Sequence, residues 1–216
     1  MSKYIDNSKK YWNDFYKRKD YSYDEIVYDD WLDYHGDIIS KEKGVVVDLG
    51  CGNGNNTRYL TEKKKQVIAC DASEEAIRLI KKNFPDIYGT KCFNMVNPFP
   101  FINNVTDLVI ADMSLHYFTK EDTIKILSEI RRILVNNGYL LVRVNALANL
   151  ANENNGFKEV ENHLYETSDG RLKRYFDYED LFKFFNIFQI KTIGEYHMTR
   201  YDVPKTTYSL CLKNKK

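Results

Sequence analysis

The sequence predicts a single α/β domain built on a mostly parallel sheet. Short apolar runs alternate with amphipathic helical segments, a glycine-rich loop follows the first of these runs, and polar or acidic residues follow several others. At 216 residues the chain is long enough to bury a sizeable core in one domain. We therefore expect one domain over residues 1–216, with residues 1–40 as an N-terminal helical cover and residues 146–176 as an insertion.

Residues 45–57, Val-Val-Val-Asp-Leu-Gly-Cys-Gly-Asn-Gly-Asn-Asn-Thr, are the stretch around which the chain is organised. A buried strand over the valines ends at Asp48, and a helix begins near Thr57. Between them the backbone can turn sharply and approach a ligand, because glycine has no Cβ. In open α/β sheets, nucleotide-like ligands bind in such a crevice. The three glycines are Gly50, Gly52 and Gly54.

The spacing of these glycines argues against dinucleotide binding, which needs glycines at relative positions one, three and six. The sixth position is Asn55 counted from Gly50, and Thr57 counted from Gly52. The carboxylate of Asp48 beside the loop suits a ligand with a positive amino group better than it suits a pyrophosphate. The stretch Asp-Leu-Gly-Cys-Gly-x-Gly closely resembles motif I of the class I S-adenosylmethionine (SAM)-dependent methyltransferases.

This resemblance covers roughly residues 40–212. It implies a seven-stranded, mostly parallel sheet with helices on both faces. It also implies SAM as the cofactor, S-adenosylhomocysteine as its product, and in-line transfer of the methyl group to an acceptor. For such a step the protein mainly supplies alignment and water exclusion.

Composition limits the possible partners. Lys plus Arg is 32 and Asp plus Glu is 31, so the chain carries no global basic field for nucleic acid. The four cysteines show no CxxC and no metal-ligand spacing, so we expect no metal and a reduced, cytoplasmic setting. No apolar run is long enough to span a bilayer, and the start shows no signal-peptide pattern.

Two helical patterns precede the first strand. Residues 3–18 carry aromatic side chains near one face, and Val27, Trp31 and Tyr34 then stand in helical register with Gly36 near the end. These segments either pack on the sheet edge or cover the cofactor. Related methyltransferases often open with a similar aromatic segment, and a sulfonium cation is attracted to aromatic faces. The candidates for that contact are Tyr11, Trp12 and Tyr16.

Residues 66–70 predict the second strand, which ends at Asp71. An acidic residue about 20 positions beyond the glycine loop is placed to accept hydrogen bonds from ribose hydroxyls. The alternative is an ordinary helix N-cap region, since Ser73 precedes a helix, and both interpretations can hold. Residues 91–93 predict the third strand. The superfamily commonly places an Asp that meets adenine directly after this strand, where this chain has Asn94, whose amide oxygen can still accept from the adenine amino group.

Residues 105–111 predict a fourth strand that opens onto residues 112–118. In related enzymes this segment passes the methionine part of SAM and faces the acceptor. His116 is a candidate general base or acceptor-orienting group. The alternative is a structural role, because Leu-His-x-Phe is frequent here in enzymes with unrelated acceptors.

A helix that begins after Thr119 is predicted to stop at residues 136–138, and residues 139–145 form the fifth strand. Arg143 and Asn145 are polar groups in an otherwise buried strand. A buried arginine needs a carboxylate or similar partner, which is either structural or functional.

Residues 146–176 interrupt the alternation of strands and helices, with a hairpin signal at Asp169–Gly170. A helix from Asp177 to Phe185 and two antiparallel strands, at residues 188–193 and 207–212, complete the chain. An insertion at this edge of a sheet is usually a lid or binding loop. We expect it to form the acceptor side of the site together with the loop at residues 197–201; the alternatives are a dimer contact or a cover of the sheet.

The residues expected to bind the cofactor are Tyr11, Trp12, Tyr16, Asp48, Gly50, Cys51, Gly52, Asn53, Gly54, Asp71, Ala72, Asn94, Met95, Asp112 and Met113. Those expected to contact the acceptor are Tyr117, Arg143, Asn145, Tyr165, Arg174, Tyr175, Arg200 and Tyr201. The arginines favour an acceptor with an anionic group.

A small-molecule acceptor is favoured. The chain contains no Asn/Asp-Pro-Pro-Tyr motif, no Pro-Cys motif and no visible RNA-binding domain. The competing hypotheses are a methyltransferase that acts on tRNA or protein, and a SAM-binding regulatory protein without transfer activity. Either a monomer or a homodimer is compatible with the sequence.

Overall fold

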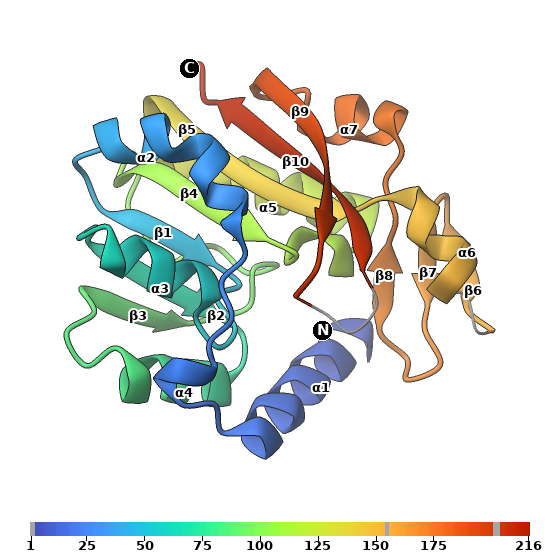
Figure 1. The fold of residues 1–216 in the computed structure, drawn as a ribbon. Coiled ribbons are helices and arrows are strands. Elements are labelled where there is room, and N and C mark those ends of the chain that lie inside the picture. Colours follow the sequence, from blue (N-terminus) through green and yellow to red (C-terminus); the bar gives the residue numbers. More distant parts are fainter. Residues whose placement is uncertain (1–2, 154–155, 201–203) are drawn as a thin grey trace.

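A seven-stranded sheet in the order β3-β2-β1-β4-β5-β10-β9 forms the centre of the protein (Figure 1). The computed structural model describes residues 3–153, 156–200 and 204–216. The first five strands of that order are parallel, and β10 runs antiparallel to both β5 and β9. The prediction of a seven-stranded, mostly parallel sheet is confirmed. The strands are β1 Val46–Leu49, β2 Val67–Asp71, β3 Gly89–Cys92, β4 Thr106–Asp112, β5 Leu134–Asn145, β9 Gln189–Met198 and β10 Lys205–Lys213.

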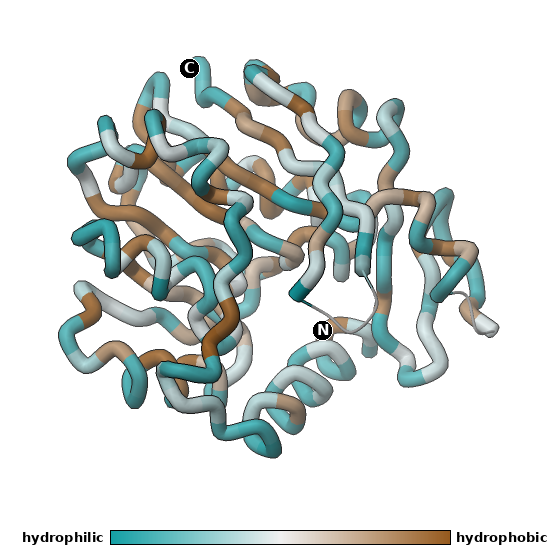
Figure 2. The backbone as a smooth tube through the Cα atoms, in the orientation of Figure 1, coloured by the Kyte–Doolittle hydropathy of each residue, from teal (hydrophilic) through white to brown (hydrophobic). Residues whose placement is uncertain are grey.

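Helices cover both faces of the sheet, because alternate residues of each buried strand point to opposite sides. Val47 and Val109 pack in a core shared with α5 and α7, whereas Val46 and Leu108 pack with η2, α2 and α3. Figure 2 shows hydrophobic residues concentrated along β1, β4 and β5. The α-helices are α1 Lys3–Lys19, α2 Gly36–Lys41, α3 Asn55–Glu62, α4 Glu74–Asn83, α5 Lys120–Ile133, α6 Leu150–Glu153 and α7 Tyr178–Phe185. The 3-10 helices are η1 Tyr23–Glu25, η2 Asp30–His35, η3 Leu115–Tyr117 and η4 Leu147–Asn149.

The second N-terminal helical pattern was predicted wrongly. Trp31 is fully buried, but Val27 is 53% exposed and Tyr34 is 76% exposed. The chain is not helical between η1 and η2, and a 3-10 helix has three residues per turn, so these side chains do not share a face. Gly36 begins α2 instead of ending a helix.

Several boundaries near the carboxyl half also differ from the prediction. Helix α5 ends at Ile133, and β5 starts directly at Leu134, so the predicted stop at residues 136–138 lies inside the strand. The pairing of β4 with β5 shifts register between Thr106 and Leu108, which accommodates the early start. Strands β9 and β10 form the predicted antiparallel pair but extend further toward each other.

The insertion folds as a small antiparallel sheet of β6 Lys158–Glu161, β7 Leu164–Glu166 and β8 Leu172–Arg174. The predicted hairpin at Asp169–Gly170 is the connection between β7 and β8. Strand β6 was not predicted, because its side chains are mostly exposed and show no apolar alternation. Helix α1 reaches this sheet, where Asn7 Nδ2 donates to the carbonyl of Gly170 at 3.0 Å (Figure 1). Among the described residues no helix combines the length and apolar character needed to cross a membrane.

Candidate functional site

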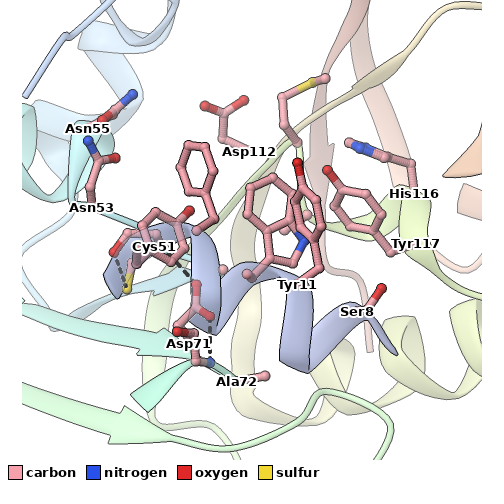
Figure 3. Close-up of a pocket in the computed structure, with 18 of the residues that line it drawn as sticks. Ser8, Tyr11, Cys51, Asn53, Asn55, Asp71, Ala72, Asp112, His116 and Tyr117 are labelled. Atoms are coloured by element: carbon pink, nitrogen blue, oxygen red, sulfur yellow. Dashed lines mark hydrogen bonds between the residues drawn. The ribbon is translucent and has the colours of Figure 1, made fainter. Parts of the chain in front are cut away.

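A cavity of about 610 Å³ lies at the carboxyl ends of the parallel strands, with α1 as one wall. Its volume is typical of small-molecule sites, which span about 300–1,000 Å³. Cys51, Asp71 and Ala72 lie at one end and His116 and Tyr117 at the other, with Tyr11 between them (Figure 3). The residues predicted to bind the cofactor that line this cavity are Tyr11, Trp12, Tyr16, Gly50, Cys51, Gly52, Asn53, Asp71, Ala72, Asn94, Met95, Asp112 and Met113.

The glycine loop folds against η3 and α4, and its glycines are required at both contacts. Gly50 has φ +79°, and a Cβ there would lie 2.4 Å from Cβ of Ser114. Gly54 has φ +102°, and a Cβ there would lie 2.6 Å from the ring of Phe84. Gly54 does not line the cavity, so the expectation that it contacts the cofactor is corrected: it fits the loop onto α4.

Asp48 also lies outside the cavity lining, contrary to the prediction. It is 1% exposed, and its Oδ2 accepts a hydrogen bond of 2.6 Å from Oγ1 of Thr57. Asp48 therefore ties the end of β1 to the first turn of α3 beneath the loop. Burial raises the pKa of Asp48 to about 7, although the bond from Thr57 opposes this shift.

This pKa predicts how Asp48→Asn changes stability with pH. An unfolded aspartate titrates near pH ~4. Between that value and about pH 7 the folded protein binds more protons than the unfolded chain, so Asp48 lowers stability as the pH rises. At pH 8 the asparagine variant should melt roughly 5 °C above the wild type, and the gain should vanish toward pH 4. Melting curves across this range test it, and a gain that does not depend on pH would contradict it.

Asp71 lies at the end of β2 beside the glycine loop. Its Oδ2 accepts from the backbone N of Gly52 at 3.0 Å, and its Oδ1 accepts from the backbone N of Ser73 at 2.9 Å. Burial raises its pKa, and these backbone bonds oppose the rise. The helix cap of α4 is Ser73, whose Oγ accepts from Ala76 N at 3.1 Å. The carboxylate of Asp71 therefore keeps acceptor capacity for a ligand in the cavity.

Asn94 and Met95 follow β3 and line the same end of the cavity. The side chain of Asn94 closes a turn, because its Oδ1 accepts from the backbone N of Val96 at 3.2 Å. One lone pair of that oxygen remains beyond this bond.

The aromatic side chains of α1 face the cavity as a group. The rings of Trp12 and Tyr16 stack with centroids 5.9 Å apart, and the ring of Trp12 meets that of Tyr117 edge-on at 5.8 Å. The guanidinium of Arg171 lies 3.5 Å from the ring centroid of Tyr11, a cation–π contact. Helix α1 thus joins the glycine-loop end of the cavity to the insertion.

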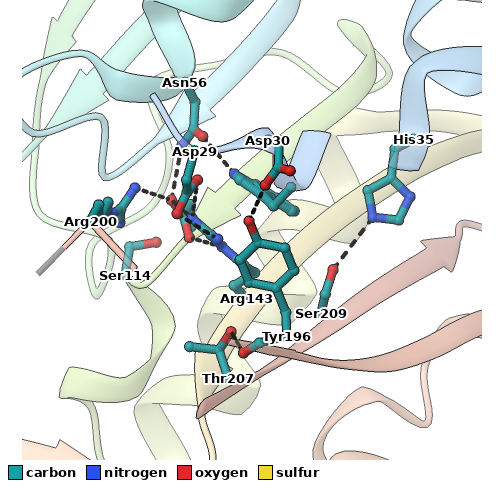
Figure 4. A network of polar contacts seen from close by, with 12 residues as sticks. Asp29, Asp30, His35, Asn56, Ser114, Arg143, Tyr196, Arg200, Thr207 and Ser209 are labelled. Carbon is teal, nitrogen blue, oxygen red and sulfur yellow. Dashed lines mark hydrogen bonds and ion pairs between the residues drawn. The ribbon is translucent and has the colours of Figure 1, made fainter. Parts of the chain in front are cut away.

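Arg143 does not contact the cavity, and the prediction that it binds the acceptor is corrected. Its side chain is fully buried and forms a bidentate ion pair with each of two carboxylates (Figure 4). The bonds to Asp29 are 2.9 and 3.0 Å long, and those to Asp112 are 2.7 and 2.8 Å long. The guanidinium also lies 4.5 Å from the ring centroid of Trp31. This arginine therefore fastens the N-terminal segment to the floor of the site.

Asp112 and Arg200 both line the cavity and contact each other, with Nη1 of Arg200 at 3.0 Å from Oδ2 of Asp112. Burial alone would raise the pKa of Asp112, but the charges of Arg143 and Arg200 outweigh it and hold that pKa well below its usual range. Asp112 is therefore ionised at neutral pH.

The acceptor residues predicted on the insertion do not face the cavity. Arg174 is 2% exposed and pairs with Glu161 at 2.5 Å, whereas Tyr175 is fully buried and donates to Glu153 at 2.7 Å. Tyr165 packs edge-on against Tyr175. None of these three side chains lines the cavity, so their predicted contact with the acceptor is corrected. Tyr201 lies outside the described residues.

Lys173 and Arg171, the residue before β8, line the cavity instead. Lys173 points away from the side of Leu172 and Arg174, because successive side chains of a strand point to opposite faces. Lys205 of β10 also lines the cavity, with its Nζ 3.2 Å from Oε1 of Glu153, and Lys173 pairs with the same carboxylate. Burial and the charge of Lys205 lower the pKa of Lys173. The alternation within the predicted hairpin was the sequence signal that could have identified Arg171 and Lys173.

His116, Tyr117 and Asn145 line the cavity as predicted for their end of the strands. His116 is 1% exposed, and its ring contacts that of Tyr117 with centroids 4.2 Å apart. Burial and then the charge of Lys173 lower the pKa of His116 well below its ordinary value, so the imidazole is neutral at neutral pH.

Comparison with known proteins finds a methyltransferase domain in the chain. A family model described as "Methyltransferase domain" matches residues 47–142. A tRNA N(3)-methylcytidine methyltransferase of Schizosaccharomyces pombe is 25% identical over 204 residues, which cover 84% of this chain and 79% of that protein. An uncharacterized methyltransferase of Synechocystis is 33% identical over 93 residues, which cover 43% of each chain.

Solved structures share the fold. A SAM-dependent methyltransferase from Anabaena variabilis gives a TM-score of 0.73 at 16% identity, covering 100% of this chain and 96% of that one. A SAM-dependent methyltransferase from Methanosarcina mazei gives 0.70 at 18% identity, covering 81% and 94%. Residues 47–142 therefore form a methyltransferase domain, and the chain as a whole has the fold of SAM-dependent methyltransferases.

Proposed function

We propose that this methyltransferase acts on a small anionic molecule, which binds at the end of the cavity beside β8. One observation carries the proposal: basic side chains from two separate parts of the chain converge there. An anion placed among them would be held by charge-assisted hydrogen bonds, which are stronger than neutral ones. The residues are Arg171, Lys173, Arg200 and Lys205.

We propose that the other end of the cavity holds SAM. The carboxylate of Asp71 would accept from the ribose hydroxyls, Asn94 would meet the adenine, and the loop at residues 50–53 would lie along the methionine part. The residues fit such a ligand, since Oδ1 of Asn55 is buried against the cavity without a hydrogen-bond partner among the described residues. When bound, SAM supplies an electrophilic methyl group on a sulfonium. The ring group of Tyr11, Trp12 and Tyr16 suits that cation and keeps water out.

Under this proposal the protein's own residues align the acceptor more than they activate it. Lys173 of β8 and Arg171, the residue before this strand, would fix the anion, and α1 would close the site over both ligands. The neutral imidazole of His116 would donate or accept one hydrogen bond at the acceptor, according to its tautomer.

Lys173→Met tests the proposal. We expect transfer of label from methyl-labelled SAM into the small-molecule fraction of a cell extract to fall by about tenfold, because one charge-assisted bond is lost. The affinity for SAM should stay within about twofold. The matched control is Lys183→Met on α7, whose lysine is exposed and pairs with Glu179. Unchanged transfer in the Lys173 variant would refute the proposed anion site.

A tRNA acceptor is the second candidate, because the Schizosaccharomyces pombe relative carries that activity in its name. The net charge of +1 gives little general attraction to RNA. Treating the same extract with nuclease before the reaction separates the two candidates. Label that disappears with the RNA supports tRNA, and label that remains supports a small molecule.

A further inference from the structure

Asn145 holds a buried amide that is unpaired within the described part of the chain. Its side chain is fully buried against the cavity, and neither Nδ2 nor Oδ1 has a hydrogen-bond partner among those residues. Its backbone is fixed, because it pairs with Thr207 of β10 and its carbonyl accepts from Phe176 N at 2.9 Å. A buried amide without partners is costly, so the geometry calls for a ligand that pairs with both of its atoms.

His116 provides a second unpaired group at the same end of the cavity. It is 1% exposed, and its Nδ1 also lacks a hydrogen-bond partner among the residues described. Asn145 ends β5 and His116 follows β4, the neighbouring parallel strand, since Asp112 of β4 pairs in register with Arg143 of β5. The charged groups that act on the imidazole ring are Lys173, Lys205, Asp112 and Arg171. A neutral polar pair thus lies beside the basic side chains.

We propose that Asn145 and His116 form a subsite that binds a neutral amide or ring N–H/C=O edge of the acceptor. An asparagine amide offers donor and acceptor side by side in one plane, which matches a partner that presents the same pair in reverse. The rings of Tyr117 and Trp12 beside the subsite suit a planar group. The acceptor class is therefore an anionic lactam or nitrogen heterocycle. This inference rests on the proposed function and adds the second half of acceptor recognition.

Matched pairs of small carboxylates test the subsite. Orotate and 6-hydroxynicotinate are compared with benzoate, and pyroglutamate with cyclopentanecarboxylate, by calorimetry on the full chain saturated with S-adenosylhomocysteine. We expect at least one lactam or heterocycle to bind about tenfold more tightly than its carbocyclic match. Asn145→Leu should abolish that preference, while the affinities for the carbocyclic acids and for S-adenosylhomocysteine stay within about twofold.

The stability of Asn145→Leu separates recognition from a structural role. The amide makes no hydrogen bond within the described chain, so the unliganded variant should melt no lower than the wild type. Should Asn145→Leu fail to fold, the subsite is wrong unless His116→Phe removes the same preference. Equal binding within every pair, or a preference that survives in both variants, overturns the subsite.

The failure of the subsite is distinguishable from the failure of the anion site. If the carboxylates bind without preference and Lys173→Met weakens them all, the anion site stands and the subsite falls. If no carboxylate binds, or if Lys173→Met leaves every affinity unchanged, the anion site itself falls and the subsite falls with it.

Discussion

Replacing Arg143 with methionine is expected to lower the free energy of unfolding by about 3–5 kcal/mol, the largest stability loss predicted for this protein. The guanidinium is fully buried and satisfies two carboxylates, those of Asp29 and Asp112. Methionine fills a similar volume but leaves Asp29 without its ion-pair partner, while Asp112 keeps Arg200. An uncompensated buried charge is the physical cause of the loss.

Denaturant unfolding of the two proteins at pH 7 measures this change. The matched control is Arg78→Met, because Arg78 is partly exposed and pairs with Glu75 and Asp20 on the surface, where ion pairs contribute little. A double variant, Asp29→Asn with Arg143→Met, should recover part of the loss, since one orphaned charge is removed. If Arg143→Met were as stable as Arg78→Met, the buried network would not hold the N-terminal segment in place.

The contrast between Arg143 and Arg171 shows which part of the site the sequence can predict. Arg143 was recognised as a buried arginine in need of a carboxylate, but Asp29 lies 114 positions away and no local pattern connects the two. Only the packing of η2 on the sheet brings them together. The role of Arg143 therefore could not be separated from acceptor binding before the fold was known.

The alternation of side chains along β8 could have shown which of them face the cavity, but the prediction selected Arg174, which does not. Lys173 of β8 and Arg171, the residue before the strand, face the cavity, and Leu172 and Arg174 do not line it, so a shift of one residue exchanges Arg174 for Lys173. The short strand has charged residues on both faces. It therefore lacks the alternation of apolar and polar residues that normally shows which face is buried.

The cofactor end was predicted much better than the acceptor end, because its geometry is local. The loop at residues 50–54 and Asp71 follow directly from strand ends and glycine spacing, and the structure brings them together across one hydrogen bond, from Gly52 N to Asp71. The error at Asp48 has a local cause too. A carboxylate next to a ligand loop and a carboxylate tied to Thr57 beneath it look identical in sequence.

S-adenosylhomocysteine at about 100 times its dissociation constant should stabilise the wild type by about 2.7 kcal/mol, and Asp71→Ala should lose most of this gain. Ribose hydroxyls that donate to a carboxylate make charge-assisted hydrogen bonds, each worth about 1.5–3 kcal/mol. Losing them should weaken binding by ten- to a hundredfold. At the same ligand concentration, a hundredfold loss leaves only about 0.4 kcal/mol of stabilisation.

Thermal shifts and calorimetry measure the effect, each variant being compared with its own unliganded form. This reference is needed because Asp71→Ala also removes the acceptors for Gly52 N and Ser73 N and so lowers the unliganded melting temperature. Asp86→Ala, at an exposed carboxylate outside the cavity lining, serves as the control and should keep the full shift. NAD should shift neither protein, because the glycine spacing lacks the sixth position that a pyrophosphate turn requires. A full S-adenosylhomocysteine shift in Asp71→Ala would show that the ribose is held elsewhere, and a shift with NAD would contradict the assignment of the loop.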